Sequence, residues 1–137
     1  DIVWQNSGTG QCSVWLMNGT TLVSTVDLGI QSVNWKIRAV GDFNGDGSPD
    51  IVWQNTSTGQ NRIWLMNGAT FSSTLDLGTY DTSWQIVGAA DFNGDRTIDI
   101  VWQNSSTGQR AIWLMQGTTC MAGVGLGTYD TAWQIVN

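Results

Sequence analysis

The chain has 137 residues, enough for one domain, and its five Lys and Arg against eleven acidic residues give a net charge of −6. All eleven acids are Asp, there is no His, and there are only two Cys. These counts exclude His-based catalytic triads, His-ligated zinc sites and a disulfide scaffold. No basic stripe and no long apolar run is present, so we expect neither a nucleic-acid partner nor a membrane span. Strand and turn formers dominate, which predicts an all-β fold.

The chain opens with the apolar strand DIVWQN and then repeats itself with a period of 49 residues. Three Trp positions per repeat account for all nine Trp. We predict an incomplete first unit at 1–34 that lacks its first strand, complete units at 35–83 and 84–132, and a final strand at 133–137 that belongs to a unit completed elsewhere.

Each complete unit contains four short strands. In the second complete unit they are 84–92, 99–104, 109–117 and a weaker strand at 121–127, separated by the turns NGD, SSTG and QGTT. The strand IVW is wholly apolar, so both of its faces should be covered. Four-stranded sheets stacked around an axis satisfy this requirement, and the predicted fold is a β-propeller with three 49-residue repeats. Either a second chain or additional sequence would complete the ring.

An acidic, glycine-containing loop precedes this strand in both complete units. In DFNGDGSPD the oxygen-bearing side chains follow the rhythm of a calcium loop, with Gly47 where the chain must turn sharply. We predict that calcium is bound by Asp42, Asn44, Asp46 and Asp50, with the Ser48 carbonyl as a further ligand. The alternative is an Asx-turn hairpin without an ion, whose unpaired carboxylates would repel one another.

The second loop departs from this pattern, because Arg96 stands where the first loop has Gly47. A non-glycine residue at positive φ costs about 1 kcal/mol or more, and the cationic side chain adds repulsion. We therefore expect weaker calcium binding here. The predicted ligands are Asp91, Asn93, Asp95, Thr97 and Asp99. Calcium is expected to be structural in both loops, since the sequence supplies no associated base.

The loop DxNxDGxxD, the strand that follows it and the repeat resemble the FG-GAP and VCBS repeat family over the whole chain. This resemblance implies a secreted or extracellular, calcium-bearing β-propeller used for binding. The family includes integrin α-subunit heads, lectins and modules attached to secreted enzymes, so the resemblance does not fix one function.

Two loops, GTYDTSW and GTYDTAW, place an aromatic residue and a carboxylate before the first strand of a unit. Because aromatic faces stack on pyranose rings, we predict glycan binding at these rims. The alternative is a capped turn with a buried aromatic residue. The predicted ligand-binding residues are Tyr80, Asp81, Trp84, Tyr129, Asp130 and Trp133. The other six Trp lie within apolar strands and are expected in the core between units.

Polar residues at the start of each third strand offer a second candidate rim. They are suited to sugar hydroxyls, but ordinary solvated turn residues explain them equally simply, and we favour that interpretation. They are Gln11 and Cys12, then Gln60, Asn61 and Arg62, then Gln109 and Arg110.

These observations predict a non-catalytic, calcium-stabilised, lectin-like propeller. The alternative is a structural or adhesion module of a larger secreted protein that binds another protein. An enzyme is disfavoured, because the chain has no His, no Glu and no Asp pair outside the loops. Three units cannot close a ring, since propellers need at least about four. We therefore expect a homodimer that forms a six-bladed ring, with a longer single-chain propeller as the alternative.

Overall fold

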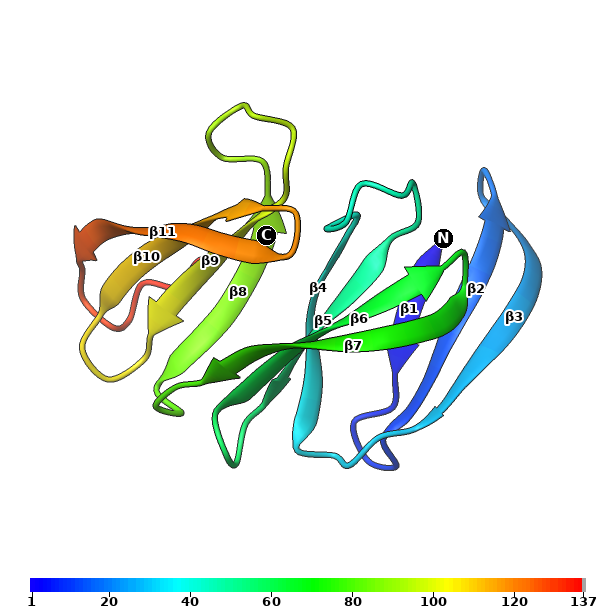
Figure 1. The fold of residues 1–137 in the computed structure, drawn as a ribbon. Helices are drawn as coiled ribbons and strands as arrows, with labels where there is room; N and C mark the ends of the chain where they lie inside the picture. The colour runs from blue at the N-terminus through cyan, green and yellow to red at the C-terminus, as the bar shows by residue number, and fades with distance from the viewer. Residues whose placement is uncertain (137) are drawn as a thin grey trace.

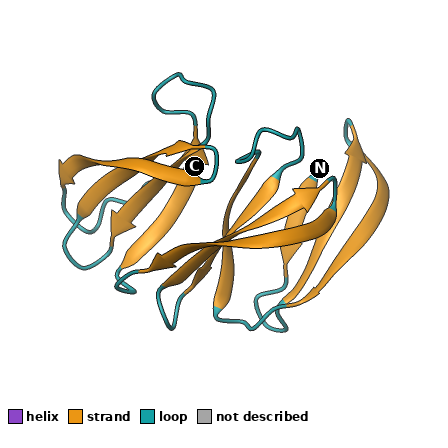
Figure 2. Cartoon of the chain, in the orientation of Figure 1, coloured by secondary structure: helices purple, strands orange, loops and turns teal. Residues whose placement is uncertain are grey.

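All strand pairs in the computed structural model are antiparallel, and the structure describes residues 1–136. No helix occurs within these residues (Figure 2). The strands form one three-stranded and two four-stranded sheets. The all-β prediction, with sheets that resemble propeller blades, is confirmed at this level.

The three sheets follow one another in chain order (Figure 1). The first sheet contains β1 (Ile2–Gln5), β2 (Gln11–Asn18) and β3 (Thr21–Ile30). The second contains β4 (Trp35–Gly41), β5 (Asp50–Asn55), β6 (Gln60–Asn67) and β7 (Thr70–Thr79). The third contains β8 (Trp84–Ala90), β9 (Asp99–Asn104), β10 (Gln109–Gln116) and β11 (Thr119–Thr128). Within each sheet, strands adjacent in sequence pair with each other, and the leading strands β4 and β8 of neighbouring sheets lie side by side.

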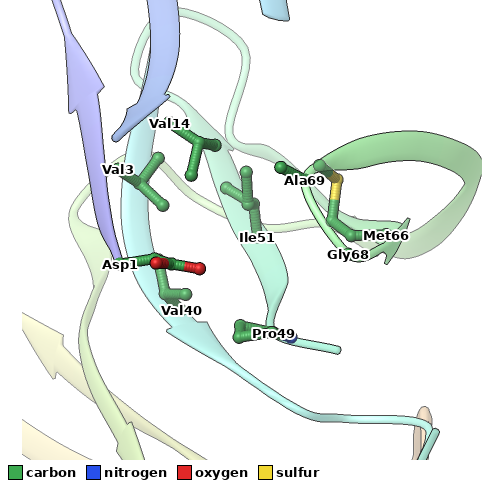
Figure 3. A pocket seen from close by; sticks show the side chains of 9 residues that line it. All are labelled: Asp1, Val3, Val14, Val40, Pro49, Ile51, Met66, Gly68 and Ala69. Atoms are coloured by element: carbon green, nitrogen blue, oxygen red, sulfur yellow. The ribbon is translucent and has the colours of Figure 1, made fainter. Parts of the chain in front are cut away.

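The core consists of two sheet-to-sheet junctions. The first junction, between the first and second sheets, buries Cys12, Ile51, Trp53, Trp64 and Met66. Figure 3 shows Val3 and Val14 of the first sheet facing Ile51 across a cavity of about 130 Å³. The second junction, between the second and third sheets, buries Phe43, Val52, Ile63, Ile86, Ile100, Trp102 and Met115.

Strand β5 contributes to both junctions, because successive side chains of a strand point to opposite faces. Ile51 and Trp53 enter the first junction, and Val52 enters the second. All three side chains are buried. The prediction that this apolar strand is covered on both faces is therefore confirmed.

A glutamine on the strand IVWQ ties each sheet to the chain that follows it. The Gln5 side chain donates to the carbonyl of Trp35 (2.6 Å) and accepts from the N–H of Ile37 (3.2 Å). Gln54 makes the same pair of hydrogen bonds to Trp84 (2.9 Å) and Ile86 (3.4 Å).

Gln103 repeats this pattern on the C-terminal segment. Its side chain donates to the carbonyl of Trp133 (3.3 Å) and accepts from the N–H of Ile135 (2.9 Å). Residues 133–136 belong to no strand, and Asn137 of the predicted final strand lies outside the described residues. Gln103 nevertheless makes the same pair of backbone hydrogen bonds to this segment that Gln5 makes to β4 and Gln54 makes to β8.

The expectation that six Trp form the core is correct for only some of them. Trp53, Trp64 and Trp102 are buried, whereas Trp15 and Trp113 are half-buried. Trp4 is 46% exposed, which corrects the prediction for this residue. The reason is its position on the outer face of the first sheet, against which no sheet packs.

Candidate ligand pocket and calcium loops

The two predicted calcium loops connect β4 to β5 and β8 to β9, and both lie along the upper edge in Figure 1. In the first loop, the Asp42 carboxylate accepts hydrogen bonds from the N–H groups of Gly45 (2.7 Å), Asp46 (3.1 Å) and Gly47 (2.9 Å). The Asn44 side-chain oxygen also accepts from the N–H of Asp46 (3.0 Å). These bonds wind the loop tightly around its first carboxylate.

The second loop reproduces this network. The Asp91 carboxylate accepts from the N–H groups of Gly94 (2.7 Å), Asp95 (3.2 Å) and Arg96 (2.8 Å). Arg96 has a φ of 71°, close to the 86° of Gly47. The expectation that Arg96 occupies a left-handed backbone conformation is confirmed, and it is the one non-glycine residue at positive φ among residues 1–136.

The last acid of each loop is buried and ties the loop to the next strand. Asp50 accepts from the N–H groups of Phe43 (3.0 Å) and Met66 (2.9 Å), and its burial raises the pKa of the carboxyl above its usual value. Asp99 accepts equivalent bonds from Phe92 (3.0 Å) and Met115 (2.9 Å). Each of these two carboxylates therefore connects its loop to a neighbouring strand through hydrogen bonds.

The predicted carbonyl-ligand positions in the loops also carry side-chain contacts to the neighbouring hairpin. The Ser48 hydroxyl accepts from the N–H of Gly68 (3.0 Å), and the Thr97 hydroxyl donates to the carbonyl of Met115 (2.7 Å). Each loop is thus fixed at two points.

The fit of these loops to calcium rests on their donor chemistry. Oxygen-bearing side chains stand at the first, third and fifth positions, and the sixth position has the positive φ of a sharp turn. Among residues 1–136, no group of three or more Asp, Glu, Cys or His side chains lies close enough together to hold a metal ion. The carboxylate oxygens are engaged by backbone N–H groups instead. The donor set fits a hard cation, and the hydrogen bonds from backbone N–H groups to Asp42 and Asp91 fix the conformation of both loops.

An aromatic pocket lies at the second junction, near the strand ends that are opposite the two loops. It has a volume of about 160 Å³ and is lined by Tyr80, Trp84, Trp102, Ala111 and Trp113. The Tyr80 ring meets the rings of Trp102 and Trp113 edge to face, with centroids 5.7 and 5.2 Å apart. The centroids of Trp102 and Trp113 are 4.7 Å apart. This arrangement exposes aromatic surface within a concave site.

The structure brings the predicted residues Tyr80 and Trp84 into this pocket, but Asp81 does not line it. The exposed Asp81 carboxylate accepts from the N–H (2.9 Å) and hydroxyl (2.6 Å) of Ser83, which lowers the pKa of Asp81 below its usual value. Sequence reasoning missed Trp102, Trp113 and Ala111 as lining residues. The sequence signal that could have identified the pocket is the small side chain of Ala111, since the equivalent residues of the other repeats are Ser13 and Arg62.

The second predicted rim forms a shallower hollow of about 320 Å³ on the outer face of the third sheet. Tyr129 and Trp133 line it together with Arg110 and Leu126. The Arg110 guanidinium donates to the carbonyl of Trp133 (2.6 Å). Asp130 lies outside the hollow, and its carboxylate accepts from the N–H of Ala132 (2.8 Å).

Of the residues that open each third strand, Gln11 and Gln109 are exposed, as the solvated-turn interpretation expects, but that interpretation is wrong for the residues that follow them. Cys12, Asn61 and Arg110 are buried, and Arg62 is half-buried. Asn61 donates to the carbonyls of Gly59 (2.7 Å) and Gly78 (3.3 Å). These side chains point into the sheets because they begin strands whose faces form the junctions. Cys12 and Cys120 are both free thiols, the first buried and the second exposed.

A family model described as FG-GAP-like repeat matches residues 42–102, from the first loop to the strand after the second loop. These residues form an FG-GAP-like repeat, which confirms the resemblance over that part of the chain. Comparisons with curated proteins and with solved structures gave no match. No helix long and apolar enough to cross a membrane occurs among residues 1–136.

Proposed function

We propose that the chain is a non-catalytic, calcium-stabilised, carbohydrate-binding module of the β-propeller type. The observation that carries this proposal is the aromatic pocket at the second junction. Small-molecule sites are concave and mostly apolar, with a few polar groups that fix orientation. The pocket combines four aromatic rings with a volume of about 160 Å³.

The chemistry of the pocket supports a sugar ligand. A pyranose has an apolar C–H face, and contact with an indole face removes apolar surface of both partners from water. The exposed Tyr80 and the half-buried Trp84 and Trp113 line the pocket and offer ring surface to such a ligand.

Calcium in this proposal stabilises the sheet edge and takes no part in chemistry. Asp42, Asn44 and Asp46 would hold the ion in the first loop, and Asp91, Asn93 and Asp95 would hold it in the second. A bound ion would neutralise the clustered carboxylates, and these residues would then orient the hairpins that join neighbouring strands. The extracellular availability of calcium and the repeat type support a secreted or extracellular location.

The outer faces of the first and third sheets support the proposed homodimer. Ile2 and Trp4 are exposed on the outer face of the first sheet, whereas their equivalents Ile51 and Trp53 are buried at the first junction. On the third sheet Leu126 is exposed, whereas its equivalent Leu77 packs into the second junction. The two outer faces are thus the two halves of a junction. We propose that two copies join through them twice, forming a six-bladed ring with two-fold symmetry.

A structural or adhesion role remains the second candidate, and the same exposed faces favour it. Trp133 is 74% exposed and Val136 is 91% exposed. Apolar patches of this kind mark sites where another protein binds. A module docked on a larger protein through these faces would need no sugar ligand.

The glycan proposal is tested by removing the tyrosines of both rims. Replacing Tyr80 and Tyr129 with Ala should weaken glycan binding about 10-fold, because each substitution removes the apolar ring surface that covers a sugar. Replacing both with Phe keeps the rings and should leave binding within about 2-fold. Isothermal titration with glycans that the wild type retains is the measurement. Unchanged binding by the double Ala variant would exclude these rims as the sugar sites.

A further inference from the structure

The repeats share their tryptophans but carry different side chains at one position beside them. Position 62 of β6 is Arg, whereas the equivalent position 111 of β10 is Ala. The tryptophans around the two positions are the same, because Trp35, Trp53 and Trp64 correspond to Trp84, Trp102 and Trp113. The two junctions are therefore a natural pair with the same tryptophans but a different central side chain, and the linker residue beside it also changes, from Gln31 to Tyr80.

At the first junction, the Arg62 guanidinium fills the space between the tryptophans. Its central carbon lies 3.9 Å from the ring centroid of Trp35, 5.3 Å from Trp64 and 5.9 Å from Trp53. All three distances are within the range of cation–π attraction. The guanidinium also donates to the Gln31 side-chain oxygen (3.0 Å), while its Nε has no partner. The aromatic faces, more than hydrogen bonds, hold this cation.

At the second junction, the cation is missing and its aromatic surroundings are retained. The Trp102–Trp113 pair has centroids 4.7 Å apart at 50°, and the Trp53–Trp64 pair has them 4.9 Å apart at 54°. Ala111 is too short to reach the surrounding rings, and an aromatic pocket of about 160 Å³ lies beside it, with the Tyr80 ring 5.7 Å from Trp102 and 5.2 Å from Trp113. Tyr80 replaces Gln31 and adds a fourth ring.

We propose that the aromatic pocket binds an organic cation, a methylated ammonium or guanidinium group, in the place that Arg62 occupies at the first junction. Aromatic rings surrounding a quaternary ammonium group are an established recognition mode for such ligands. The net charge of −6 attracts cations toward the protein surface. The inference uses the same pocket as the proposed function but goes beyond it, because it names a second class of ligand, an organic cation, for this pocket.

The test compares two probes of the same shape on the intact wild-type chain. Choline carries a quaternary ammonium group, and 3,3-dimethylbutan-1-ol is its neutral isostere. Titrations followed by the indole N–H resonances should show saturable choline binding with a Kd on the order of millimolar. The neutral isostere should bind at least ~10-fold more weakly. Absence of choline binding, or equal binding of both probes, would overturn the proposal.

Two variants test where the cation binds. Ala111→Arg copies the first junction into the second, so the chain's own guanidinium should fill the aromatic pocket and abolish choline binding. Arg62→Ala opens the first junction, so choline should then also shift the indole resonance of Trp64. Retained choline binding in folded Ala111→Arg protein would place the site elsewhere. The comparison of probes on the wild type requires no variant to fold.

The same titrations separate this inference from the proposed function. Neutral glycans are titrated into the wild type in parallel. Choline binding without glycan binding would support the cation inference and contradict the glycan proposal. Glycan binding at the aromatic pocket without choline binding would do the reverse.

Discussion

Arg96 holds a left-handed backbone conformation that its first-loop counterpart, Gly47, adopts without strain. Replacing Arg96 with Gly should therefore relieve about 1 kcal/mol of backbone strain and remove a positive charge beside the predicted calcium ligands. We predict that Arg96→Gly raises the calcium affinity of the second loop about 5-fold or more. Calcium titration by isothermal calorimetry measures this change.

The first loop provides the matched control for this prediction. Gly47→Arg should introduce the same strain and charge, and it should weaken calcium binding there by a similar factor. If neither substitution changes calcium affinity, the backbone argument is wrong.

Asp81 provides a pH-dependent contact next to the aromatic pocket. The hydroxyl and N–H of Ser83 donate to its carboxylate, which lowers the pKa of Asp81 from its usual 3.8. A lowered folded-state pKa contributes stability above the unfolded pKa, and this contribution is lost as the pH falls through the folded pKa. We predict that Ser83→Ala moves the Asp81 midpoint upward toward 3.8. A carboxyl NMR titration decides this, and an unmoved midpoint would contradict the assignment.

Single residues show where sequence reasoning was sufficient and where it failed. The strain at Arg96 was predictable because its aligned partner is a glycine in a sharp turn. The roles of Arg62 and Arg110 were not, because a charged residue beside a turn is normally solvated. Only the tertiary structure shows that both guanidinium groups lie against aromatic or backbone partners inside the sheets.

At the scale of elements, the Gln54 side chain connects β5 to β8 across the second junction. It is 3% exposed and satisfies one carbonyl and one N–H of β8. Leu has a volume similar to that of Gln, but it cannot form hydrogen bonds with these two backbone groups. Gln54→Leu should therefore cost about 2 kcal/mol or more of unfolding free energy. Urea unfolding measures the loss.

Gln103→Leu is the matched control, because Gln103 makes the same bonds to residues 133 and 135. Trp133 is 74% exposed, so water can replace much of what this substitution removes. We expect a clearly smaller cost in the monomeric chain. Equal costs at both positions would show that the glutamine bonds are not what couples the second and third sheets.

The strands themselves were largely predictable, because they are short apolar runs bounded by Gly-containing turns. The burial of Ile51, Val52 and Trp53 in β5 was likewise predictable, because these three consecutive residues are all apolar. The exposure of Trp4 was not predictable, because the residues around Trp4 are the same as those around the buried Trp53. What differs is the presence of a neighbouring sheet, and that is a property of the assembly.

At the scale of the whole molecule, the two unpaired outer faces predict self-association. Burying Trp4 and Leu126 at two new junctions should stabilise a pair of chains, because apolar burial contributes about 25 cal/mol per Å². We predict twice the chain mass, about 30 kDa from a chain of 14.9 kDa, by light scattering. Trp4→Asp should shift the mass toward the monomer. A wild-type chain that stays monodisperse as a monomer would contradict the six-bladed ring.

The central claim joins calcium, fold and sugar binding, and a glycan array tests it most directly. The array is run with the whole chain, once in calcium and once in EDTA. The account predicts retention of several neutral glycans in calcium and loss of this binding in EDTA, because the ion stabilises the native state that forms the pocket. An array without glycan binding in calcium, or with the same binding in EDTA, would contradict a calcium-stabilised carbohydrate-binding module.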